Sequence, residues 1–487
     1  MSRGNRRNSK MSKIAGLVRA LEERKARLME GCTAPAAEAR SSESGKEPVW
    51  EKEYDALILG DGPKGTYSMN PQVSQVNNNV LVIAGTGGGK TKSVVEANLL
   101  HAFHQSMVVL LTKRRLLDQY GPLLKSRGYD VRVLDLVHPE RSDVGYDPML
   151  HLRDESDIIG LAKALVFSSG CTSAKEPYWE NSAADLFAAF VKLARRLYGN
   201  SARMEDVLER IQKIDYPPYK DDDDDDGIVY HPEDDDIDLY ELRGLTPVSQ
   251  FFALQHYEPQ MFMSWYQFYK NADNTKACIR SMLVSAVNGV LTKGIQKIRA
   301  MKKQLEFTDL VNRKTVLFIL TSPVNPALHP FANLVLGAMF KELFEYAESL
   351  PGGRVPIPLT AICDDFATGG QIPNFQQHIS IFREKGIAAM MLVQSLAQLE
   401  SMYGQAASVT IQDNTDNIIY MGGNNLDTAE QMARRINKPM DEVLALPRGQ
   451  IYLFRSGQKG LQLQRYQIFN DPLYQQKIAP LDAANAR

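Results

Sequence analysis

Residues Val80 to Thr91 read Val-Leu-Val-Ile-Ala-Gly-Thr-Gly-Gly-Gly-Lys-Thr. A short apolar run thus leads into a glycine-rich loop that ends in a lysine and a threonine, and a helical pattern follows at once. Glycines let the backbone turn its N–H groups towards a phosphate at the positive end of the following helix. Lys90 can reach the β- and γ-phosphates, and the Thr91 hydroxyl can hold Mg²⁺.

This loop predicts that the protein binds a nucleoside triphosphate. Ala84 stands where such loops usually begin with a glycine, and we expect a small residue to be tolerated there. A purely structural glycine turn is the alternative, but the spacing and the strand–loop–helix context favour phosphate binding. The predicted nucleotide-binding residues are Gly85, Thr86, Gly87, Gly88, Gly89, Lys90, Thr91 and Lys92.

Length, charge and cysteine content limit the class of protein. At 487 residues the chain exceeds one ordinary core, so we expect two or more domains. A net charge of −2 excludes a globally basic nucleic-acid binder, although local patches stay open. The 4 cysteines form no CxxC pair, which favours a reducing cytoplasm over a zinc or disulfide framework. No apolar run approaches the ~20 residues that cross a bilayer, and we expect neither a membrane span nor a signal peptide.

Alternating strands and helices occupy residues 47–154 and resume over residues 309–475. Expected strands are Ala56–Leu59, Val80–Ala84, Met107–Leu111, Asp130–Leu136, Val316–Leu320, Leu359–Cys363, Ala388–Val393, Asn417–Met421 and Gln450–Phe454, and early helices are Thr91–His104 and Leu116–Arg127. Crossover helices between strands imply a parallel sheet. We therefore expect an α/β core that is split in the sequence.

Residues 155–308 interrupt that core with an all-α domain. The expected helices are Glu155–Val166, Tyr178–Leu197, Met204–Ile214, Pro247–Gln255, Met261–Lys270 and Thr275–Leu291. An acidic loop over residues 215–240 contains Asp221–Asp226, which predicts a solvated loop or, alternatively, recognition of a basic partner. Lys270, Lys276 and Arg280 lie near Tyr266, Phe268 and Tyr269, a mixture that favours a helical core with a charged face over a DNA-binding stripe.

Both ends of the chain are expected to lie outside these domains. Residues 1–30 form a basic amphipathic pattern, and residues 31–46 resemble a linker in composition, so residues 1–46 are expected to be an arm. The basic helix is either a solvated or self-docked element or a means of attachment to a membrane surface or membrane partner. Residues 476–487 are expected to be a tail.

An acidic strand end supplies the second half of a hydrolytic site. The run Pro358 to Asp365 reads Pro-Leu-Thr-Ala-Ile-Cys-Asp-Asp. Asp364 can hold Mg²⁺ through water, and Asp365 can polarise the attacking water. Two aspartates after a strand can also be a helix cap, but the pairing with Lys90 favours catalysis.

Two further residues are candidates for the γ-phosphate end of the site. Gln394 follows an expected strand and can sense the γ-phosphate or the attacking water; a surface amide is the alternative. Arg383 precedes the same strand and can act as an arginine finger in a neighbour's site, the alternative being a local ion pair. The predicted catalytic residues are Lys90, Asp364, Asp365, Gln394 and Arg383, and the predicted metal residues are Thr91 and Asp364.

Several ordered segments resemble the TraG/TraD-type coupling ATPases of type IV secretion and conjugation. They span roughly residues 55–475 and include the glycine loop, Ala97-Asn-Leu-Leu100, Tyr120 to Tyr129, Tyr178 to Ala184, Asp364 to Phe375, Arg383 to Ile387 and Gln394 to Gly404. The most specific of them reads Asp-Asp-Phe-Ala-Thr-Gly-Gly-Gln-Ile-Pro-Asn-Phe, with the family's Phe-Ala and Ile-Pro continuation.

The resemblance implies a RecA-like P-loop NTPase core with an all-α domain and a homo-hexamer around a channel. It implies ATP with Mg²⁺ as cofactors, single- or double-stranded DNA and a relaxase as partners, and the coupling of that substrate to a secretion channel. A membrane-embedded channel subunit is a further partner, which residues 1–30 are expected to contact. The expected location is cytoplasmic, peripherally on the inner face of a bacterial cell membrane.

Three departures from the family pattern qualify that expectation. Coupling proteins usually carry N-terminal membrane spans, and none is recognised here. Asp365 stands where the family usually has Glu, which shortens the reach of the expected base by one methylene. Residues Leu111 to Arg115 read Leu-Thr-Lys-Arg-Arg where the family reads Asp-Pro-Lys-Gly-Glu, so only Lys113 is kept. Slow turnover or hydrolysis that needs a partner is consistent with these changes.

The leading functional hypothesis is an ATP-driven translocase that couples DNA or nucleoprotein to a secretion channel. The second hypothesis is a docking platform without motor activity, in which nucleotide binding only switches or stabilises assembly. A third is a chromosome-segregation or packaging translocase with a related core. The Phe366-Ala and Ile372-Pro segments together with the helical insertion favour the coupling family over the third.

Overall fold

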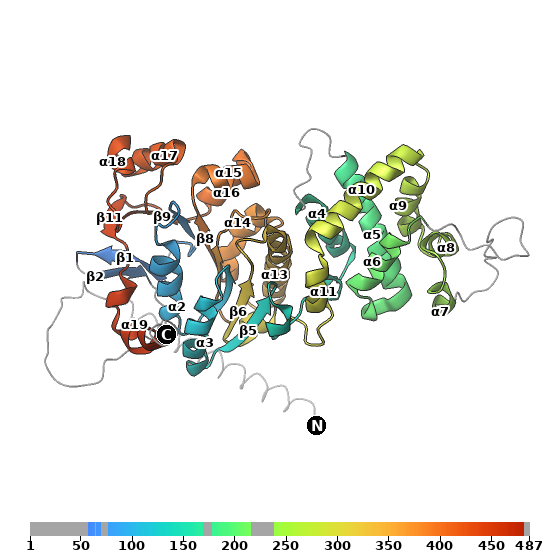
Figure 1. Cartoon of the computed structure of the whole chain (residues 1–487), viewed down its shortest axis with the longest axis horizontal. Coiled ribbons are helices and arrows are strands. Elements are labelled where there is room, and N and C mark those ends of the chain that lie inside the picture. The colour runs from blue at the N-terminus through green and yellow to red at the C-terminus, as the bar shows by residue number, and fades with distance from the viewer. Residues whose placement is uncertain (1–56, 64, 70–75, 169–177, 216–237, 482–487) are drawn as a thin grey trace, which may run out of the picture. The chain divides into compact units, whose positions relative to one another are not determined.

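Eleven strands form one sheet in the computed structural model, which describes residues 57–63, 65–69, 76–168, 178–215 and 238–481 (Figure 1). The strand order is β2-β1-β11-β10-β9-β3-β8-β7-β4-β6-β5. Seven neighbouring strands are parallel: β9 (Asn417–Tyr420), β3 (Val80–Ile83), β8 (Ile387–Val393), β7 (Leu359–Asp364), β4 (Ser106–Leu111), β6 (Thr315–Leu320) and β5 (Asp130–Asp135). The expected α/β fold with a mostly parallel sheet is confirmed.

The other four strands extend the sheet beyond β9 with antiparallel pairs. They are β1 (Leu57–Gly62), β2 (Gly65–Met69), β10 (Gln450–Arg455) and β11 (Leu461–Gln464). The sequence analysis found no strand at β2 or β11. β2 contains a glycine and polar residues, which are poor strand formers. β11 does alternate leucine and glutamine, but it has only four residues, so its period-2 pattern is short.

Apolar residues cover both faces of the parallel strands. In β4, Val108 belongs to one buried cluster and Val109 to another, and Leu317 and Phe318 divide between the same two clusters in β6. Strands that are buried on both faces read as continuous apolar runs, as Met107 to Leu111 does. Such runs are readily found in the sequence, which explains why these strands were predicted nearly to the residue.

Helices cover the two faces of the sheet. One buried cluster includes residues of the helix after the glycine loop, η1 (Thr91–Glu96) with α2 (Ala97–Leu100), and of α3 (Arg115–Ser126) and α19 (Pro472–Lys477). The other includes residues of α13 (His329–Ser349), α14 (Phe375–Lys385), α15 (Leu396–Tyr403), α16 (Gln405–Asp413), α17 (Leu426–Ile436) and α18 (Met440–Leu444). The first helix ends at Leu100 instead of the expected His104, because His101 leaves the helical conformation.

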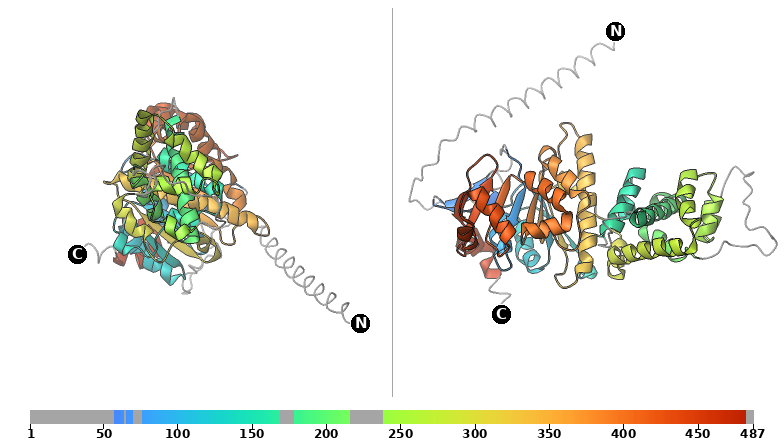
Figure 2. Two further views of the ribbon diagram at one scale, coloured as in Figure 1. Left: turned by 90° about the vertical axis from the view of Figure 1, so that its right-hand side faces the viewer. Right: turned by 90° about the horizontal axis from the view of Figure 1, so that it is seen from above.

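The region of the expected all-α domain contains helices throughout its described part. They are α4 (Glu155–Ser168), α5 (Tyr178–Tyr198), α6 (Met204–Gln212), α7 (Leu239–Leu242), α8 (Pro247–Ala253), α9 (Pro259–Tyr269), α10 (Asp273–Val290) and α11 (Lys293–Arg299). Figure 2 shows that the long helices of this region lie together. Phe190, Phe251 and Trp265 form its aromatic centre. The domain boundaries themselves stay a prediction.

Short elements connect these parts: η2 (Pro139–Arg141), η3 (Pro148–His151), η4 (Gly199–Ser201), α12 (Asp309–Asn312), η5 (Pro326–Leu328) and η6 (Ile468–Asn470). The expected arm of residues 1–46 and the run Asp221–Asp226 lie outside the described residues. Among the helices that are described, none combines the length and apolarity needed to cross a bilayer.

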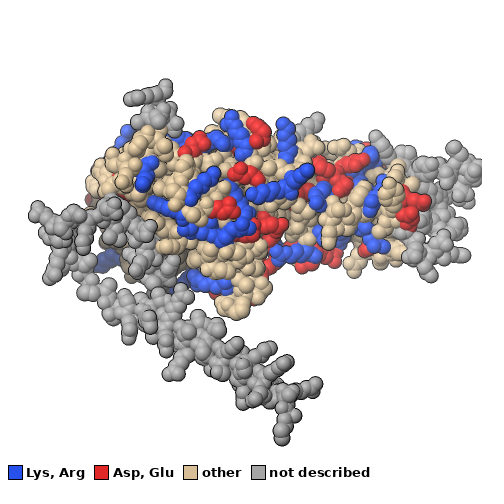
Figure 3. Space-filling view, turned by 90° about the horizontal axis from the view of Figure 1, so that it is seen from below, with Lys and Arg blue, Asp and Glu red and all other residues tan. Residues whose placement is uncertain are grey.

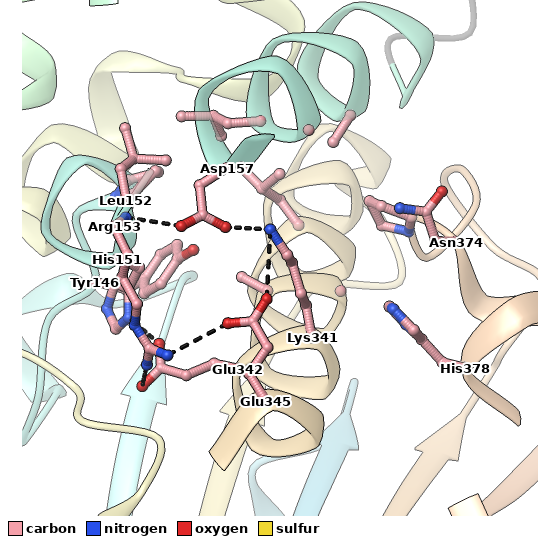
Figure 4. Close-up of a pocket in the computed structure, with 18 residues that line it drawn as sticks. Tyr146, His151, Leu152, Arg153, Asp157, Lys341, Glu342, Glu345, Asn374 and His378 are labelled. Atoms are coloured by element: carbon pink, nitrogen blue, oxygen red, sulfur yellow. Dashed lines mark hydrogen bonds and ion pairs between the residues drawn. The ribbon is translucent and has the colours of Figure 1, made fainter. Parts of the chain in front are cut away.

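Ion pairs join the helical region to the core helix α13 (Figure 4). Lys341 pairs with Asp157 at the start of α4. Arg153 contacts Glu342 at 3.2 Å and Glu345 at 3.3 Å. These charged residues line a cavity between α4 and α13, away from the glycine loop. The helical region is therefore attached to α13 by charged contacts as well as by apolar packing.

A buried asparagine fixes the start of the strand that leads into the glycine loop. Asn79 is 1 % exposed; its side-chain oxygen accepts a hydrogen bond from the Ala389 amide at 2.9 Å, and its amide donates to Asn414 O at 2.8 Å. The Asn417 side chain in turn donates to the Asn79 carbonyl at 3.1 Å. Asn79 thus ties β3 to β8 and β9, the two strands between which β3 lies.

Asn79→Ala is expected to lower the midpoint of thermal unfolding. The change leaves the buried Ala389 amide without its partner, a loss of about 1–3 kcal/mol. Asn288→Ala, at an exposed position on α10, is the matched control and should leave the midpoint unchanged. Scanning fluorimetry of the nucleotide-free protein measures both; equal midpoints for the two variants would show that Asn79 does not hold these strands together.

Candidate nucleotide site

The glycine loop lies where the carboxyl ends of parallel strands meet. Its first residues are held by neighbouring strands: the Ala84 amide donates to Val393 O at 3.1 Å, and the Gly85 amide donates to Gly422 O at 3.1 Å. Val393 ends β8, and Gly422 closely follows β9. The loop is therefore anchored on both sides before it turns into the helix.

The loop needs glycine at its turning points. Gly87 and Gly89 have φ values of +75° and +86°, a region that other residues avoid. A Cβ atom on Gly88 would lie 3.0 Å from both Ala84 Cβ and Gly85 O, closer than such contacts normally come. Among the described residues, the amides of Gly87 and Gly89 have no hydrogen-bond partner, so both remain able to bind an anion.

The Lys90 side chain lies across the base of the loop. Its ammonium donates to Ala84 O at 3.1 Å and to Val393 O at 3.3 Å. Burial lowers the pKa of Lys90, and the nearby carboxylates of Asp365 and Asp364 partly offset that effect. A cation that is partly desolvated beside two carboxylates and free backbone amides is arranged to bind a phosphate.

Thr91 and Asp364, the two residues predicted to hold a metal, lie in direct contact. The Thr91 hydroxyl donates to Asp364 Oδ2 at 2.8 Å. Asp364 ends β7, and β8 alone separates that strand from β3. Burial raises the pKa of Asp364, the Thr91 hydrogen bond opposes that rise, and the charge of Asp365 adds to it.

Asp365 stands in a strained turn just beyond the strand end. Its φ of +110° lies in the region that favours glycine. The next residue continues the sheet contact, since the Phe366 amide donates to Leu392 O at 3.0 Å. Phe366 itself is buried and stacks on Tyr403, whose hydroxyl oxygen accepts from the Ile372 amide at 3.0 Å. The Phe-Ala and Ile-Pro continuation therefore fixes the turn that presents Asp365.

The other predicted site residues differ in how close they lie to the glycine loop. Gln394 directly follows β8 and is exposed, at the same edge of the sheet as the loop. Thr86 is exposed on the loop, and Lys92 pairs with the buried Glu96 at 2.8 Å. Arg383 is exposed in the last turn of α14, before β8 begins, so the structure does not bring it to the loop of its own chain.

Two residues near the site were not predicted. Lys113, after β4, lies near enough to lower the pKa of Asp364, and it is the one position of its segment that keeps the family residue. Arg465, after β11, donates to Gly88 O at 3.4 Å. No motif marks Arg465, because its closeness to the loop results from the antiparallel strands β10 and β11, one of which was not predicted.

These residues fit a magnesium-bound nucleotide. Mg²⁺ is usually held by one or two protein oxygens together with phosphate and water oxygens, and Thr91 and Asp364 present two oxygens side by side. The free amides of Gly87 and Gly89 and the ammonium of Lys90 lie next to them. The arrangement can bind a triphosphate and place an acidic side chain, Asp365, beyond it.

Asp365→Gly is expected to stabilise the protein while it lowers nucleotide hydrolysis. Glycine relieves a strained φ that costs about 1–3 kcal/mol, but it removes the carboxylate. Asp365→Ala is the control, because alanine removes the carboxylate and keeps the strain. The glycine variant should therefore unfold at a higher temperature than the alanine variant, the reverse of the usual order, while both lose turnover. An alanine variant at least as stable as the glycine variant would show that this backbone is unstrained.

Several solved structures resemble this chain. The bacterial conjugative coupling protein TrwBΔN70 in complex with sulphate is 15% identical, with a TM-score of 0.60 over 87% of this chain and 96% of that chain. TrwB in complex with ADP and Mg²⁺ is 15% identical, with a TM-score of 0.56 over 80% and 84%. VirB4 of Thermoanaerobacter pseudethanolicus is 10% identical, with a TM-score of 0.52 over 88% and 99%. At these identities the likeness concerns the fold.

Comparison with protein sequences gives two findings. A search of curated proteins finds no matching relative. The profile of a family described as type IV secretory system conjugative DNA transfer matches residues 38–439, which is most of the chain and includes both Lys90 and Asp364. The chain belongs to the type IV secretory system conjugative DNA transfer family.

Proposed function

We propose that this protein is an ATP-hydrolysing coupling protein that drives DNA, or a relaxase–DNA complex, into a type IV secretion channel. The observation that carries the proposal is the hydrogen bond between Thr91 and Asp364, which joins the glycine loop to the acidic strand end. Family membership supports the coupling role. TrwB, whose fold this chain resembles, has been solved with ADP and Mg²⁺, which supports ATP and Mg²⁺ as the ligands here.

The loop residues bind and orient the triphosphate in this proposal. The amides of Gly87 and Gly89 donate to phosphate oxygens, and Lys90 exchanges its contacts with Ala84 O and Val393 O for the β- and γ-phosphates. Thr91 and Asp364 would hold Mg²⁺, directly and through water. Bound there, Mg²⁺ supplies positive charge that neutralises the phosphate oxygens as the reaction proceeds.

The acidic turn beyond β7 activates the attacking water in this proposal. Asp365 accepts a proton from the water that attacks the γ-phosphorus, and the bond from that phosphorus to the β–γ bridging oxygen breaks to release ADP. Gln394, at the end of β8, orients the same water or senses the γ-phosphate. Arg383 lies at the opposite edge of its own sheet, so any role as an arginine finger is in the site of a neighbouring subunit of a homo-hexamer.

The basic and aromatic residues of α9 and α10 bear on the contact with DNA. Figure 3 shows one face of the molecule, on which basic and acidic side chains are interspersed. The ammonium of Lys270, just after α9, lies 4.5 Å from the ring centre of Tyr266 in α9. Lys276 of α10 pairs with Asp273 at 2.9 Å. Trp265 of α9 is buried. These contacts favour a helical core with a charged face over an exposed stacking surface.

ATP turnover with and without single- and double-stranded DNA tests the motor hypothesis. Lys90→Ala should abolish ATP binding, because it removes the partly buried cation of the loop. Asp364→Asn should still bind ATP but hydrolyse it roughly 10²-fold more slowly, about 2.7 kcal/mol in the barrier. Lys163→Ala, at an exposed position on α4, is the control for the loss of one lysine and should behave as wild type.

Two outcomes would contradict this hypothesis. An ATPase that ignores DNA in every assembly state would count against a DNA motor. Normal substrate transfer by an Asp364→Asn variant that binds ATP without hydrolysing it would favour the docking platform instead.

Residues 1–30 are proposed to dock the protein on the inner face of the cell membrane or on a membrane-embedded channel subunit. Their basic amphipathic pattern is the basis for this, and they lie outside the described residues. Deletion of residues 1–30 should leave ATP binding intact and move the protein from the membrane fraction to the supernatant of lysed cells. The same distribution before and after deletion would refute the docking role.

A further inference from the structure

The segment that follows β11 lies beside the glycine loop and is firmly held there. The Arg465 amide donates to Gly449 O at 2.7 Å, and the Gln467 amide donates to Asp61 Oδ2 at 2.9 Å. Asp471 accepts from Tyr466 and lies 2.7 Å from His101, at the end of the helix that follows the loop. The segment after β11 is therefore fixed by hydrogen bonds to Gly449, Asp61 and His101, which lie in three different parts of the core.

Arg465 directs its guanidinium at the loop. Its Nη1 atom donates to Gly88 O at 3.4 Å, and a Cβ atom on Gly89 would come within 2.6 Å of the same nitrogen. No carboxylate within the described parts of the chain forms an ion pair with Arg465. A guanidinium has five N–H donors, so most of its capacity remains for an anion at the loop.

Phe469 presents an aromatic ring to solvent four residues further on. Its side chain is 53% exposed and meets the buried Tyr474 edge to face, with ring centres 5.4 Å apart. The Lys92 ammonium lies 5.3 Å from the Phe469 ring centre and is itself paired with buried Glu96. An exposed ring that is supported in this way, next to a phosphate-binding loop, is arranged for stacking.

The order of the strands tells which end of a nucleotide would reach these residues. Asp364 lies on the β7 side of the loop, and β10 and β11 lie on the opposite side, beyond β9. A triphosphate whose γ end lies at Asp364 and Thr91 therefore extends along the loop towards Arg465. The nucleoside then leaves the loop on the side where Phe469 is exposed.

We propose that Arg465 and Phe469 form the nucleoside side of the site, with Arg465 bound to the α-phosphate and Phe469 stacked on a purine base. This inference rests on the proposed nucleotide binding and adds the residues that recognise the nucleoside end. Because stacking reads the face of the base and not its edge, it favours a large ring system without selecting between purines.

Titration calorimetry of the full-length protein with Mg²⁺–ATP and Mg²⁺–ADP tests the assignment. Phe469→Ala should weaken both ligands by roughly tenfold, and Phe469→Trp should restore binding to within about threefold of wild type. Arg465→Ala should weaken ATP and ADP by the same factor, because both ligands carry the α-phosphate. A contact with the γ-phosphate would instead weaken ATP alone.

The controls remove one aromatic ring and one arginine that lie on the surface at other helices. Tyr240→Ala removes an aromatic ring that is 78% exposed on α7, and Arg434→Ala removes an exposed arginine of α17; neither should change affinity. Unchanged affinity in Phe469→Ala and Arg465→Ala, with wild type binding ATP, would overturn this inference alone. So would a Phe469→Trp variant as weak as Phe469→Ala. No ATP binding by wild type would overturn the proposed function itself.

Discussion

The hydrogen bond between the Thr91 hydroxyl and Asp364 Oδ2 joins two residues 273 positions apart in the sequence. It forms because Thr91 follows β3 and Asp364 ends β7, two parallel strands whose carboxyl ends share one edge of the sheet. The residues between them include the whole helical region, which is inserted in the sequence between β5 and β6. The candidate site thus depends on the order of the strands in the sheet. Its two halves lie together although a long helical region separates them in the sequence.

Burial at this edge shifts the pKa values of two charged groups of the site. Lys90 has a lowered pKa and Asp364 a raised pKa, in both cases because burial disfavours the charged form. The two groups partly offset each other, since a cation and a carboxylate each stabilise the charged form of the other. A ligand that combines a divalent cation with a polyanion satisfies both groups at once, which is why a magnesium-bound triphosphate suits this edge better than either ion alone.

Much of the fold and the centre of the site could be predicted from the sequence. Apolar runs such as Val316 to Leu320 mark the strands, and the spacing of Lys90 and Thr91 after the glycines marks the loop. Contacts that depend on the antiparallel extension of the sheet could not be predicted. Arg465 lies near Gly88 because β10 pairs with β9 and β11 pairs with β10. The positive φ of Asp365 likewise has no sequence signal, because aspartate is not a residue that this backbone region favours.

The most direct test of this account is a crystal structure of the protein with Mg²⁺ and a non-hydrolysable ATP analogue. The account predicts a metal bound to the Thr91 hydroxyl and bridged by water to Asp364, with the Lys90 ammonium on the β- and γ-phosphates. A nucleotide bound elsewhere would contradict it. So would a loop-bound nucleotide whose metal lies away from Asp364.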